Sequence, residues 1–450
     1  MNVQLEIVSI VDEGLGHSGH VVAVDGRALV IDPLRVIEPY LAVIEHNGWR
    51  LAWTADTHTH ADYVSGSPEL ARLGATFLAS RGAHLDVVHQ PLDPGDEIDL
   101  GGVTLRALPT PGHTPDHLAY LLLDRDQPLA VFTGGSLMVG TVGRPDLLGP
   151  EHASELARAM WHSLHEQLLV LPDALPVYPT HGAGSFCSAA GTDERTTTIG
   201  REKTTNALLQ VPDEDTFARH LVGGLGSLPT YFSWLPERNR QGLGPAPSAP
   251  LRSLSVDATQ RLIAMGAEVV DVRPVASFAA RHVPESLSNP LRPVFASWLG
   301  WLVAPDRQLV FIIDATTDRV ELVRQCANIG YDHFAGYLDG GVDAWAEAGL
   351  PTGSLELVPA GHITGPVLDV RQAGEYRAGH IPDARNIELG ALTAVADEIS
   401  GPVTVMCGHG ERAASAASVL ARHAVDGVRI ATGGPEEWAT TTGELLQIEP

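Results

Sequence analysis

The sequence has few cysteines, few basic residues and no long apolar run, and each shortage excludes a class of protein. Only three cysteines occur among 450 residues; this small, odd number of widely spaced thiols excludes a disulfide framework and indicates a reducing cytoplasm. Lysine and arginine total 29 against 55 acidic residues, a formal net charge of −26. Nucleic acids and anionic membranes both require a basic surface, so neither is expected as a partner. The longest apolar runs, such as "EQLLVLPDALPVY", are broken by proline and charge before they reach a membrane span, and the opening "MNVQLEIVSIVDEGLG" predicts no signal peptide.

What is present suits a chain of several globular domains. Hydrophobic residues make up 44% and charged residues 19% of the sequence, and domains of roughly 100–200 residues predict two to four of them. The first block, residues 1–237, alternates short β-type runs with helical stretches such as "EHASELARAMWHSLHEQLLVL". The segment "RNRQGLGPAPSAP" (238–250) is rich in glycine and proline, lacks periodicity and is predicted to be a linker.

Behind this predicted linker the sequence repeats itself. "VVDVRPVASFAARHVPES" (269–286) matches "VLDVRQAGEYRAGHIPDA" (367–384), and "YLDGGVDAW" (337–345) matches "IATGGPEEW" (430–438). A period of about 100 residues is too long for a solenoid and indicates a duplicated domain. Each copy alternates strands and helices, which predicts a parallel sheet with helices on both faces, over residues 251–354 and 355–450.

The second copy contains a cysteine in a glycine-rich loop. The β-type run "PVTVM" leads into "CGHGER" and then into a helical segment, so backbone N–H groups and the helix N-terminus should converge inside the loop. Cys407 opens this loop and Arg412 closes it, and both the amides and the cation favour a thiolate. Between them lie Gly408, His409, Gly410 and Glu411. The loop is one residue shorter than that of cysteine-based phosphatases, which suits a group smaller than phosphate, such as the outer sulfur of a persulfide.

These residues resemble the rhodanese family of sulfurtransferases, through "DVR…GHIPDA", "CGHGER" and "GGPEEW". The resemblance implies that Cys407 carries sulfane sulfur as a persulfide, whose charge the loop amides and Arg412 hold. In the first copy the matching segment is "VFIIDATTDR", with Asp314 in place of the cysteine and Arg319 in place of the arginine. A carboxylate cannot carry sulfane sulfur, so residues 251–354 are predicted to be an inactive rhodanese-like domain and residues 355–450 an active one.

Four histidine-bearing or glycine-bearing segments stand out in the first block. They are "THTHADY" (57–63), "TPGHTPDH" (110–117), "FTGGSLMVGTVGRPDLLG" (132–149) and "YPTHGAGSFC" (178–187). In this order they resemble the metallo-β-lactamase superfamily, and most of all the persulfide dioxygenases that occur fused to rhodanese domains. The resemblance implies an αββα sandwich ahead of the two rhodanese-like α/β domains, and thus an α/β chain throughout.

Carried over by position, the first metal pocket of the superfamily corresponds to His58, His60 and His113, all residues that suit a divalent zinc or iron ion. The second pocket retains only Asp62 and His181. Tyr63 stands where the family has a further histidine, and Gly135 stands where it has a carboxylate. A two-metal hydrolase is therefore poorly supported.

The missing carboxylate at Gly135 also affects the expected dioxygenase site. The resemblance implies that persulfide dioxygenases bind one iron through the residues that correspond to His58 and His113 and through that carboxylate. Three outcomes remain open: His60 completes a three-histidine site, water fills the vacancy with Asp62 behind it, or no metal binds. One divalent metal is expected, iron(II) rather than zinc(II). Tyr63 is expected to fill the vacated histidine space and donate a hydrogen bond, and Arg144 and Asp146 to form an ion pair that shapes the pocket. Cys187 and Cys326 are expected to pack in the interior.

Three hypotheses for function follow. The first is a cytoplasmic enzyme of sulfur metabolism that oxidises a low-molecular-weight thiol persulfide to sulfite and transfers sulfur through Cys407. Its expected partners are the persulfide and thiosulfate or sulfite, and a homo-oligomer is left open. The second is a thioester hydrolase of the glyoxalase II type. The third is a non-catalytic metallo-β-lactamase scaffold whose sulfurtransferase domain alone turns over.

Overall fold

The computed structural model describes residues 4–182, 184–187 and 194–449. The chain divides into two compact units. Residues 1–247 together with 324–330 form the first unit, and residues 248–323 together with 331–450 form the second. Among the described residues, no helix combines the length and apolarity that crossing a membrane would require.

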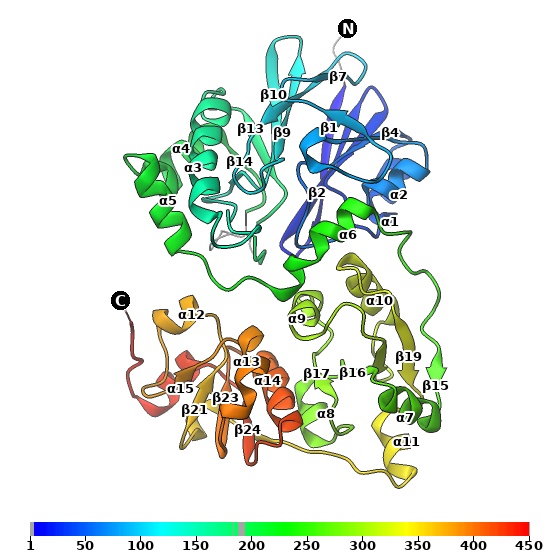
Figure 1. Ribbon diagram of the computed structural model, residues 1–450, viewed down its shortest axis with the longest axis vertical. Helices are drawn as coiled ribbons and strands as arrows, with labels where there is room; N and C mark the ends of the chain where they lie inside the picture. Colours follow the sequence, from blue (N-terminus) through cyan, green and yellow to red (C-terminus); the bar gives the residue numbers. More distant parts are fainter. Residues whose placement is uncertain (1–3, 183, 188–193, 450) are drawn as a thin grey trace. The chain divides into compact units, whose positions relative to one another are not determined.

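The first unit is built on two six-stranded sheets (Figure 1). The first sheet follows the chain order and contains β1 (Leu5–Asp12), β2 (His17–Val24), β3 (Arg27–Ile31), β4 (Arg50–Ala55), β5 (Thr76–Ser80) and β6 (Gln90–Leu92). The second sheet, in spatial order, contains β14 (Thr197–Thr198), β13 (Pro176–Pro179), β10 (Gln127–Gly134), β9 (Leu118–Asp124), β8 (Thr104–Pro109) and β7 (Glu97–Asp99). A separate hairpin joins β11 (Leu137–Met138) and β12 (Thr141–Val142).

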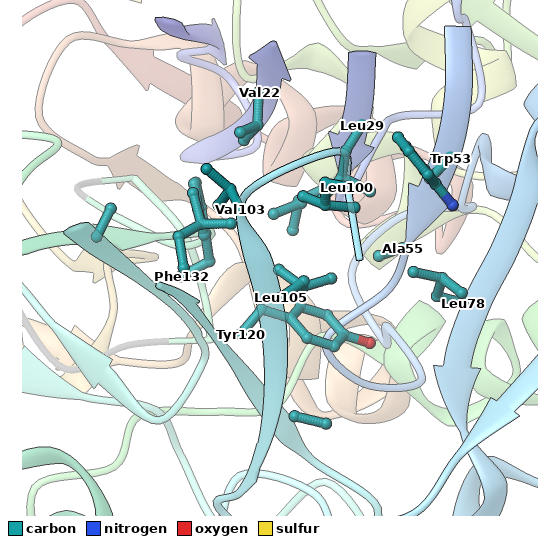
Figure 2. Packing of buried hydrophobic residues seen from close by; sticks show 14 of the residues in the cluster. Val22, Leu29, Trp53, Ala55, Leu78, Leu100, Val103, Leu105, Tyr120 and Phe132 are labelled. Carbon is teal, nitrogen blue, oxygen red and sulfur yellow. The ribbon is translucent and has the colours of Figure 1, made fainter. Parts of the chain in front are cut away.

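The hydrophobic core of this unit lies between the facing sheets (Figure 2). Val22, Leu29 and Trp53 from the first sheet meet Leu105 and Phe132 from the second. Strand β9 shows why both faces of the second sheet are apolar: Leu118, Tyr120 and Leu122 belong to this core, whereas the alternate residues Ala119, Leu121 and Leu123 belong to a second cluster. Side chains alternate along a strand, so a run as apolar as β9 requires cover on both faces.

Helices supply that cover. The second cluster joins the outer face of β9, β10 and β13 to α3 (Ala153–Ser163) and α5 (Glu214–Gly223), and α3 continues as a short π-helix over Leu164–Leu168. The first sheet contacts α1 (Glu38–His46) and α2 (Ser67–Arg72). The predicted αββα sandwich is therefore confirmed. The remaining helices of this region are α4 (Ile199–Thr205) and α6 (Leu235–Gln241).

The predicted linker over 238–250 is partly wrong, because its first four residues belong to α6. The sequence contains the reasons: Pro236 lies in the first turn, where its missing N–H costs nothing, and Gly242 follows the helix with φ +73°. The proposed domain limits at 237, 250 and 354 otherwise remain predictions.

The second unit contains the two copies as five-stranded sheets with the same strand order. The first sheet runs β15 (Ser253–Leu254), β19 (Phe334–Leu338), β18 (Leu309–Ile312), β16 (Glu268–Asp271) and β17 (Leu287–Ser288). The second runs β20 (Glu356–Val358), β24 (Val428–Ala431), β23 (Val403–Met406), β21 (Val367–Asp369) and β22 (Arg385–Asn386). All neighbouring strands are parallel in both sheets, so the predicted parallel sheets are confirmed.

The α-helices of the second copy that the structure describes correspond in order to the last four α-helices of the first copy. The first copy has α7 (Val256–Ala264), α8 (Val275–Ala280), α9 (Phe295–Leu302), α10 (Arg319–Asn328) and α11 (Gly341–Glu347). The second has α12 (Ala373–Ala378), α13 (Leu389–Val395), α14 (Glu411–Arg422) and α15 (Pro435–Thr442). Asp271 pairs with Arg273 at 2.6 Å, and Asp369 pairs with Arg371 at the same distance. The repeated "DVR" motif is thus a repeated buried ion pair.

Candidate metal and sulfur sites

The candidate metal residues of the first unit all follow the C-terminal ends of strands. His58, His60 and Asp62 follow β4, His113 follows β8, and His181 follows β13. Their side chains are buried, with at most 2% of each residue exposed. The two sheets therefore bring together residues that lie more than 120 positions apart in the sequence.

Three imidazoles, those of His58, His60 and His113, each have a hydrogen-bond partner at one ring nitrogen and no partner at the other. Nδ1 of His58 lies 2.9 Å from the Thr57 hydroxyl, and Nδ1 of His113 donates to the Arg144 carbonyl at 2.8 Å. Nε2 of His60 lies 3.1 Å from the Asp32 carboxylate. The opposite atoms, Nε2 of His58, Nδ1 of His60 and Nε2 of His113, are buried and form no hydrogen bond. Unpartnered buried nitrogens are costly, and an anchored imidazole with one free nitrogen is the usual arrangement of a metal ligand.

The rings pack closely enough to share an ion, although the closest groupings differ from the predicted trio. Ring centroids are 4.2 Å apart for His58 and His60 and 4.8 Å apart for His58 and His113. Ligand atoms within 4.8 Å of one another occur in two sets that could take an ion here: His58, His60 and His181; and His113, His181 and Cys187. His181 belongs to both sets, so it is more central than its predicted place in a depleted second pocket.

Burial favours the neutral form of His58 and His113, which is the form that binds metals. Burial lowers the pKa of His113 to about 3, with the neighbouring His181 adding to the effect, and it holds the pKa of His58 well below its usual range. His60 differs: burial opposes its charged form, but the Asp32 carboxylate outweighs burial and raises the pKa of His60.

Asp32 is the organising residue that the sequence did not reveal. It follows β3, is fully buried, and accepts hydrogen bonds from the Thr57 backbone N–H at 2.7 Å and the Thr57 hydroxyl at 2.8 Å, as well as from His60 and Thr180. Asp32 thereby joins the loops after β3, β4 and β13. A single aspartate after a β-type run carries no motif, so only the tertiary structure identifies it.

The two positions that depart from the family pattern are filled by other groups. The Tyr63 ring stacks on His60, with centroids 4.3 Å apart, and its hydroxyl lies 2.9 Å from Nε2 of His60. At Gly135, an added Cβ would lie only 2.2 Å from Cδ2 of His113. The imidazole of His113 therefore occupies the space that a side chain at position 135 would need.

Neighbouring residues support this arrangement. Arg144 forms a bidentate ion pair with Asp146, at 2.6 and 2.8 Å, in the geometry that the sequence suggested. His117, which sequence analysis did not assign, uses both ring nitrogens, one near the Thr110 hydroxyl and one accepting from the Gly135 N–H. A small recess lined by Asp56, His58, Thr59 and His60, among other residues, lies beside the cluster.

The cysteine loop of the second copy has the predicted form. Cys407 directly follows β23, and its sulfur accepts the Gly410 N–H at 3.1 Å. Gly410 has φ +102°, a conformation that glycine adopts readily, and it begins α14. Arg412 donates to both carboxylate oxygens of Glu375, at 2.6 and 2.8 Å. Glu375 is a second residue that the sequence did not single out.

The matching loop of the first copy has a different chemistry. Asp314 accepts hydrogen bonds from the Thr316 N–H at 2.9 Å and from the Thr316 hydroxyl at 2.7 Å; these bonds lower the pKa of Asp314. Arg319 lies over the Tyr337 ring, 4.3 Å from its centroid. This loop is closed by its own side chains and contains no sulfur nucleophile.

Comparisons with known proteins agree with both parts of the chain. The rhodanese-like domain family matches residues 255–348 and 355–441. The mitochondrial persulfide dioxygenase of Homo sapiens is 33% identical over 175 residues, which is 38% of this chain and 65% of that protein. A hydroxyacylglutathione hydrolase of Rhodopseudomonas palustris is 32% identical over 184 residues, which is 40% of this chain and 67% of that protein. The chain thus spans slightly less than two thirds of the length of its persulfide dioxygenase relatives.

A solved structure extends the similarity beyond the first domain. The crystal structure of a metallo-β-lactamase from Staphylococcus aureus is 26% identical, with a TM-score of 0.66, and it covers 75% of this chain and 99% of its own. That coverage exceeds what the first unit alone could supply. The chain therefore belongs to the metallo-β-lactamase superfamily; its first domain is similar to persulfide dioxygenases and to hydroxyacylglutathione hydrolases, and two rhodanese-like domains follow it.

Proposed function

We propose that this chain is a bifunctional enzyme of sulfur metabolism. Its first domain oxidises a low-molecular-weight thiol persulfide to sulfite, and its last domain transfers sulfane sulfur through Cys407. The observation that carries the proposal is the set of buried imidazole nitrogens without partners at His58, His60 and His113. The similarity to persulfide dioxygenases and the two rhodanese-like domains support it.

In the oxidative half, one persulfide, one O₂ and one water give one thiol, one sulfite and two protons. The four-electron reduction of O₂ is balanced by oxidation of the outer sulfur, whose bond to the inner sulfur breaks. A divalent ion would supply open positions for sulfur and oxygen; iron(II) is proposed for this oxidation, because zinc(II), the other candidate ion, has no redox chemistry. His58, His60 and His113 would hold it, with Asp62 and His181 close by. Asp32 and the Arg144 carbonyl orient two of these rings, and the apolar core excludes bulk water.

In the transfer half, the Cys407 thiolate attacks the outer sulfur of thiosulfate, a sulfur–sulfur bond forms, and sulfite leaves with the electron pair of the broken bond. Cyanide or another thiol then takes the sulfur and regenerates the thiolate. The Gly410 N–H donates to the reacting sulfur, and Arg412 supplies positive charge at the end of the loop. Fusion of the two domains raises the local concentration of the sulfur species that they exchange.

Persulfide, thiosulfate and sulfite are accordingly the proposed small-molecule partners. A cytoplasmic location is part of the same proposal, supported by the three thiols Cys187, Cys326 and Cys407, which form no disulfide.

The test combines metal analysis with two assays on the full-length chain made in cells supplied with iron and zinc. We expect close to one equivalent of metal, oxygen uptake on addition of glutathione persulfide, and thiocyanate formation from thiosulfate and cyanide. His113→Ala should lose oxygen uptake and keep thiocyanate formation, whereas His152→Ala, at a half-exposed side chain, should keep both. Metal below about a tenth of an equivalent would refute the oxidative half, because a buried site built for metal retains it.

Hydrolysis of a thioester is the second candidate, favoured by the hydroxyacylglutathione hydrolase relatives. Tyr63 and Gly135 argue against it, because they remove ligands that a two-metal site needs. Turnover of an acyl-glutathione that exceeds oxygen uptake would establish the hydrolase. If neither reaction occurs while thiocyanate still forms, the first domain is a scaffold.

A further inference from the structure

The pocket of the first domain has no carboxylate at position 135 and has no room for one. A Cβ at Gly135 would lie 2.2 Å from Cδ2 and 2.8 Å from Nε2 of His113. A divalent ion held by neutral imidazoles alone keeps its full charge in a buried environment, which is unfavourable. Besides the nearby Asp62 carboxylate, an anionic ligand from another part of the chain would offset this charge.

Cys187 lies in the right place to provide one. Its sulfur and the ligand atoms of His113 and His181 are all within 4.8 Å of one another. All three residues are at most 1% exposed. Sulfur and nitrogen ligands of a tetrahedral ion lie about 3.6 Å apart, given metal bonds of about 2.3 and 2.1 Å. Small side-chain rotations would close the remaining gap.

A second, independent observation indicates that a cation belongs here. Nε2 of His113, both ring nitrogens of His181 and both carboxylate oxygens of Asp62 are buried without a hydrogen bond. Nδ1 of His181 and one Asp62 oxygen are 3.2 Å apart, but their geometry is not that of a hydrogen bond. A single cation among His113, His181 and Cys187 would bind Nε2 of His113 and one ring nitrogen of His181, and it would face the Asp62 carboxylate.

The backbone of Arg144 connects two of these side chains. Its carbonyl accepts from Nδ1 of His113 at 2.8 Å, and its N–H donates to the Cys187 carbonyl at 2.9 Å. The Arg144 guanidinium also donates to the Phe186 carbonyl at 3.0 Å. The backbone at Phe186 and Cys187 is thereby fixed beside His113 by the same residue that orients the ring.

We propose that Cys187 is a metal ligand, and that its thiolate replaces the carboxylate missing at position 135 in a site with His113 and His181. On binding, the sulfur–hydrogen bond is exchanged for a sulfur–metal bond, and the proton leaves to solvent. Imidazole with one thiolate suits zinc(II), cobalt(II) or iron(II). The inference deepens the proposed function by keeping His113 as a ligand and placing His181 and Cys187, instead of His58 and His60, around the ion. It rests on the proposed function only in requiring that this pocket binds a metal.

Cobalt(II) substitution tests the assignment, because ligand-field bands report any bound cobalt whereas a near-ultraviolet charge-transfer band reports a thiolate ligand. The full-length chain is stripped of metal and titrated with cobalt(II). We expect both kinds of band in the wild type and in Cys326→Ser and Cys407→Ser, which remove the other two thiols. Cys187→Ser should lose the charge-transfer band and bind cobalt at least about 10-fold more weakly.

Cys187→Asp separates charge from sulfur, since an anionic oxygen ligand should restore the affinity without the charge-transfer band. Ligand-field bands without a charge-transfer band in the wild type would overturn the role of Cys187 while leaving a metal in the pocket. A charge-transfer band that survives Cys187→Ser would overturn it equally. Absence of all cobalt bands from correctly folded protein would overturn this inference together with the oxidative half of the proposed function.

Discussion

The histidine pocket of the first domain and the cysteine loop of the last domain differ in how far each departs from its family. The cysteine loop keeps a nucleophile, a glycine in a left-handed conformation and a closing arginine. The histidine pocket has changed at Tyr63 and Gly135. Neither change leaves a hole: the Tyr63 ring stacks on His60, and the His113 ring fills the space beside Gly135.

The comparison shows that a pocket can lose family ligands, here at positions 63 and 135, and still retain the imidazoles that could bind a metal. Interiors are close-packed, so a smaller or altered residue shifts its neighbours rather than leaving a cavity. In this pocket the shift leaves three imidazoles anchored and three of their nitrogens free. We therefore ask two questions: whether the histidine pocket still binds a metal with a changed set of ligands, and whether the cysteine loop, which retains its family residues, still transfers sulfur.

The largest expected effect concerns the loop. Cys407→Ser should reduce thiocyanate formation by at least about 1000-fold, because a hydroxyl cannot carry sulfane sulfur and loss of a nucleophile has effects of this size or greater. Metal content and oxygen uptake should not change. The matched variant is Asp314→Asn, at the same position of the first copy, which should leave thiocyanate formation intact. Equal losses in both variants would show that the two copies act together.

The next prediction concerns the stabilising role of Asp32, which joins the loops around the histidine pocket. Asp32→Ala should lower the free energy of unfolding of the first domain by about 3–5 kcal/mol, since it leaves His60 and Thr57 without their buried acceptor. Chemical unfolding followed by tryptophan fluorescence measures this. Asp93→Ala is the control, because Asp93 forms an exposed ion pair with Arg81 and should change stability by no more than about 0.5 kcal/mol.

The Asp32 effect should also depend on pH. Burial raises the pKa of Asp32, but His60 and the hydrogen-bond donors outweigh burial and lower it below its usual value. A carboxylate with a depressed pKa stabilises the fold above its unfolded pKa of about 3.9, and this stabilisation is lost as the pH falls further. The difference between wild type and Asp32→Ala should shrink as the pH falls below about 4. A difference that does not change with pH would show that the charge of Asp32 is unimportant.

A smaller effect tests whether position 135 has been refilled. Gly135→Ala should destabilise the first domain by about 1–3 kcal/mol, because the new Cβ overlaps the His113 ring. Gly135→Asp should destabilise at least as much and bind less metal, although it restores the family's carboxylate. Gly223→Ala is the control, since nothing lies within 4 Å of a Cβ at that position. A gain of metal binding in Gly135→Asp would mean that the pocket is a damaged family site rather than a rebuilt one.

The sequence alone predicted the parts of the molecule that are encoded by periodicity or by a motif. The 98-residue offset between Asp271 and Asp369 predicted the duplicated sheets, and the resemblance of the four histidine-bearing or glycine-bearing segments to the metallo-β-lactamase superfamily predicted the sandwich. The same resemblance predicted that His58, His60 and His113 lie together in one pocket. These features depend on patterns within the sequence, so they can be predicted without the tertiary structure.

The features that the sequence did not predict depend on contacts between distant segments. Asp32 acts through Thr57, His60 and Thr180, and none of these spacings forms a motif. Cys187 was expected to pack in the core, and it is buried, but its neighbours are His113 and His181 rather than hydrocarbon alone. Which ring nitrogen is free, and which space the His113 ring fills, are properties of the folded pocket only.

The smallest expected effect concerns the arginine that closes the cysteine loop. Glu375 neutralises Arg412 through two hydrogen bonds, at side chains that are 42% and 16% exposed. Glu375→Gln removes the negative charge and keeps one acceptor, so thiosulfate, a dianion, should bind more tightly. A partly exposed ion pair is worth at most about 1 kcal/mol, which corresponds to a decrease in KM for thiosulfate of up to about 5-fold with little change in kcat. The decrease should weaken at high salt, and Glu444→Gln, an exposed carboxylate of the same domain, should not reproduce it. An increase in KM would instead show that Glu375 serves to orient Arg412, and that the loop depends on a positioning residue as the histidine pocket depends on Asp32.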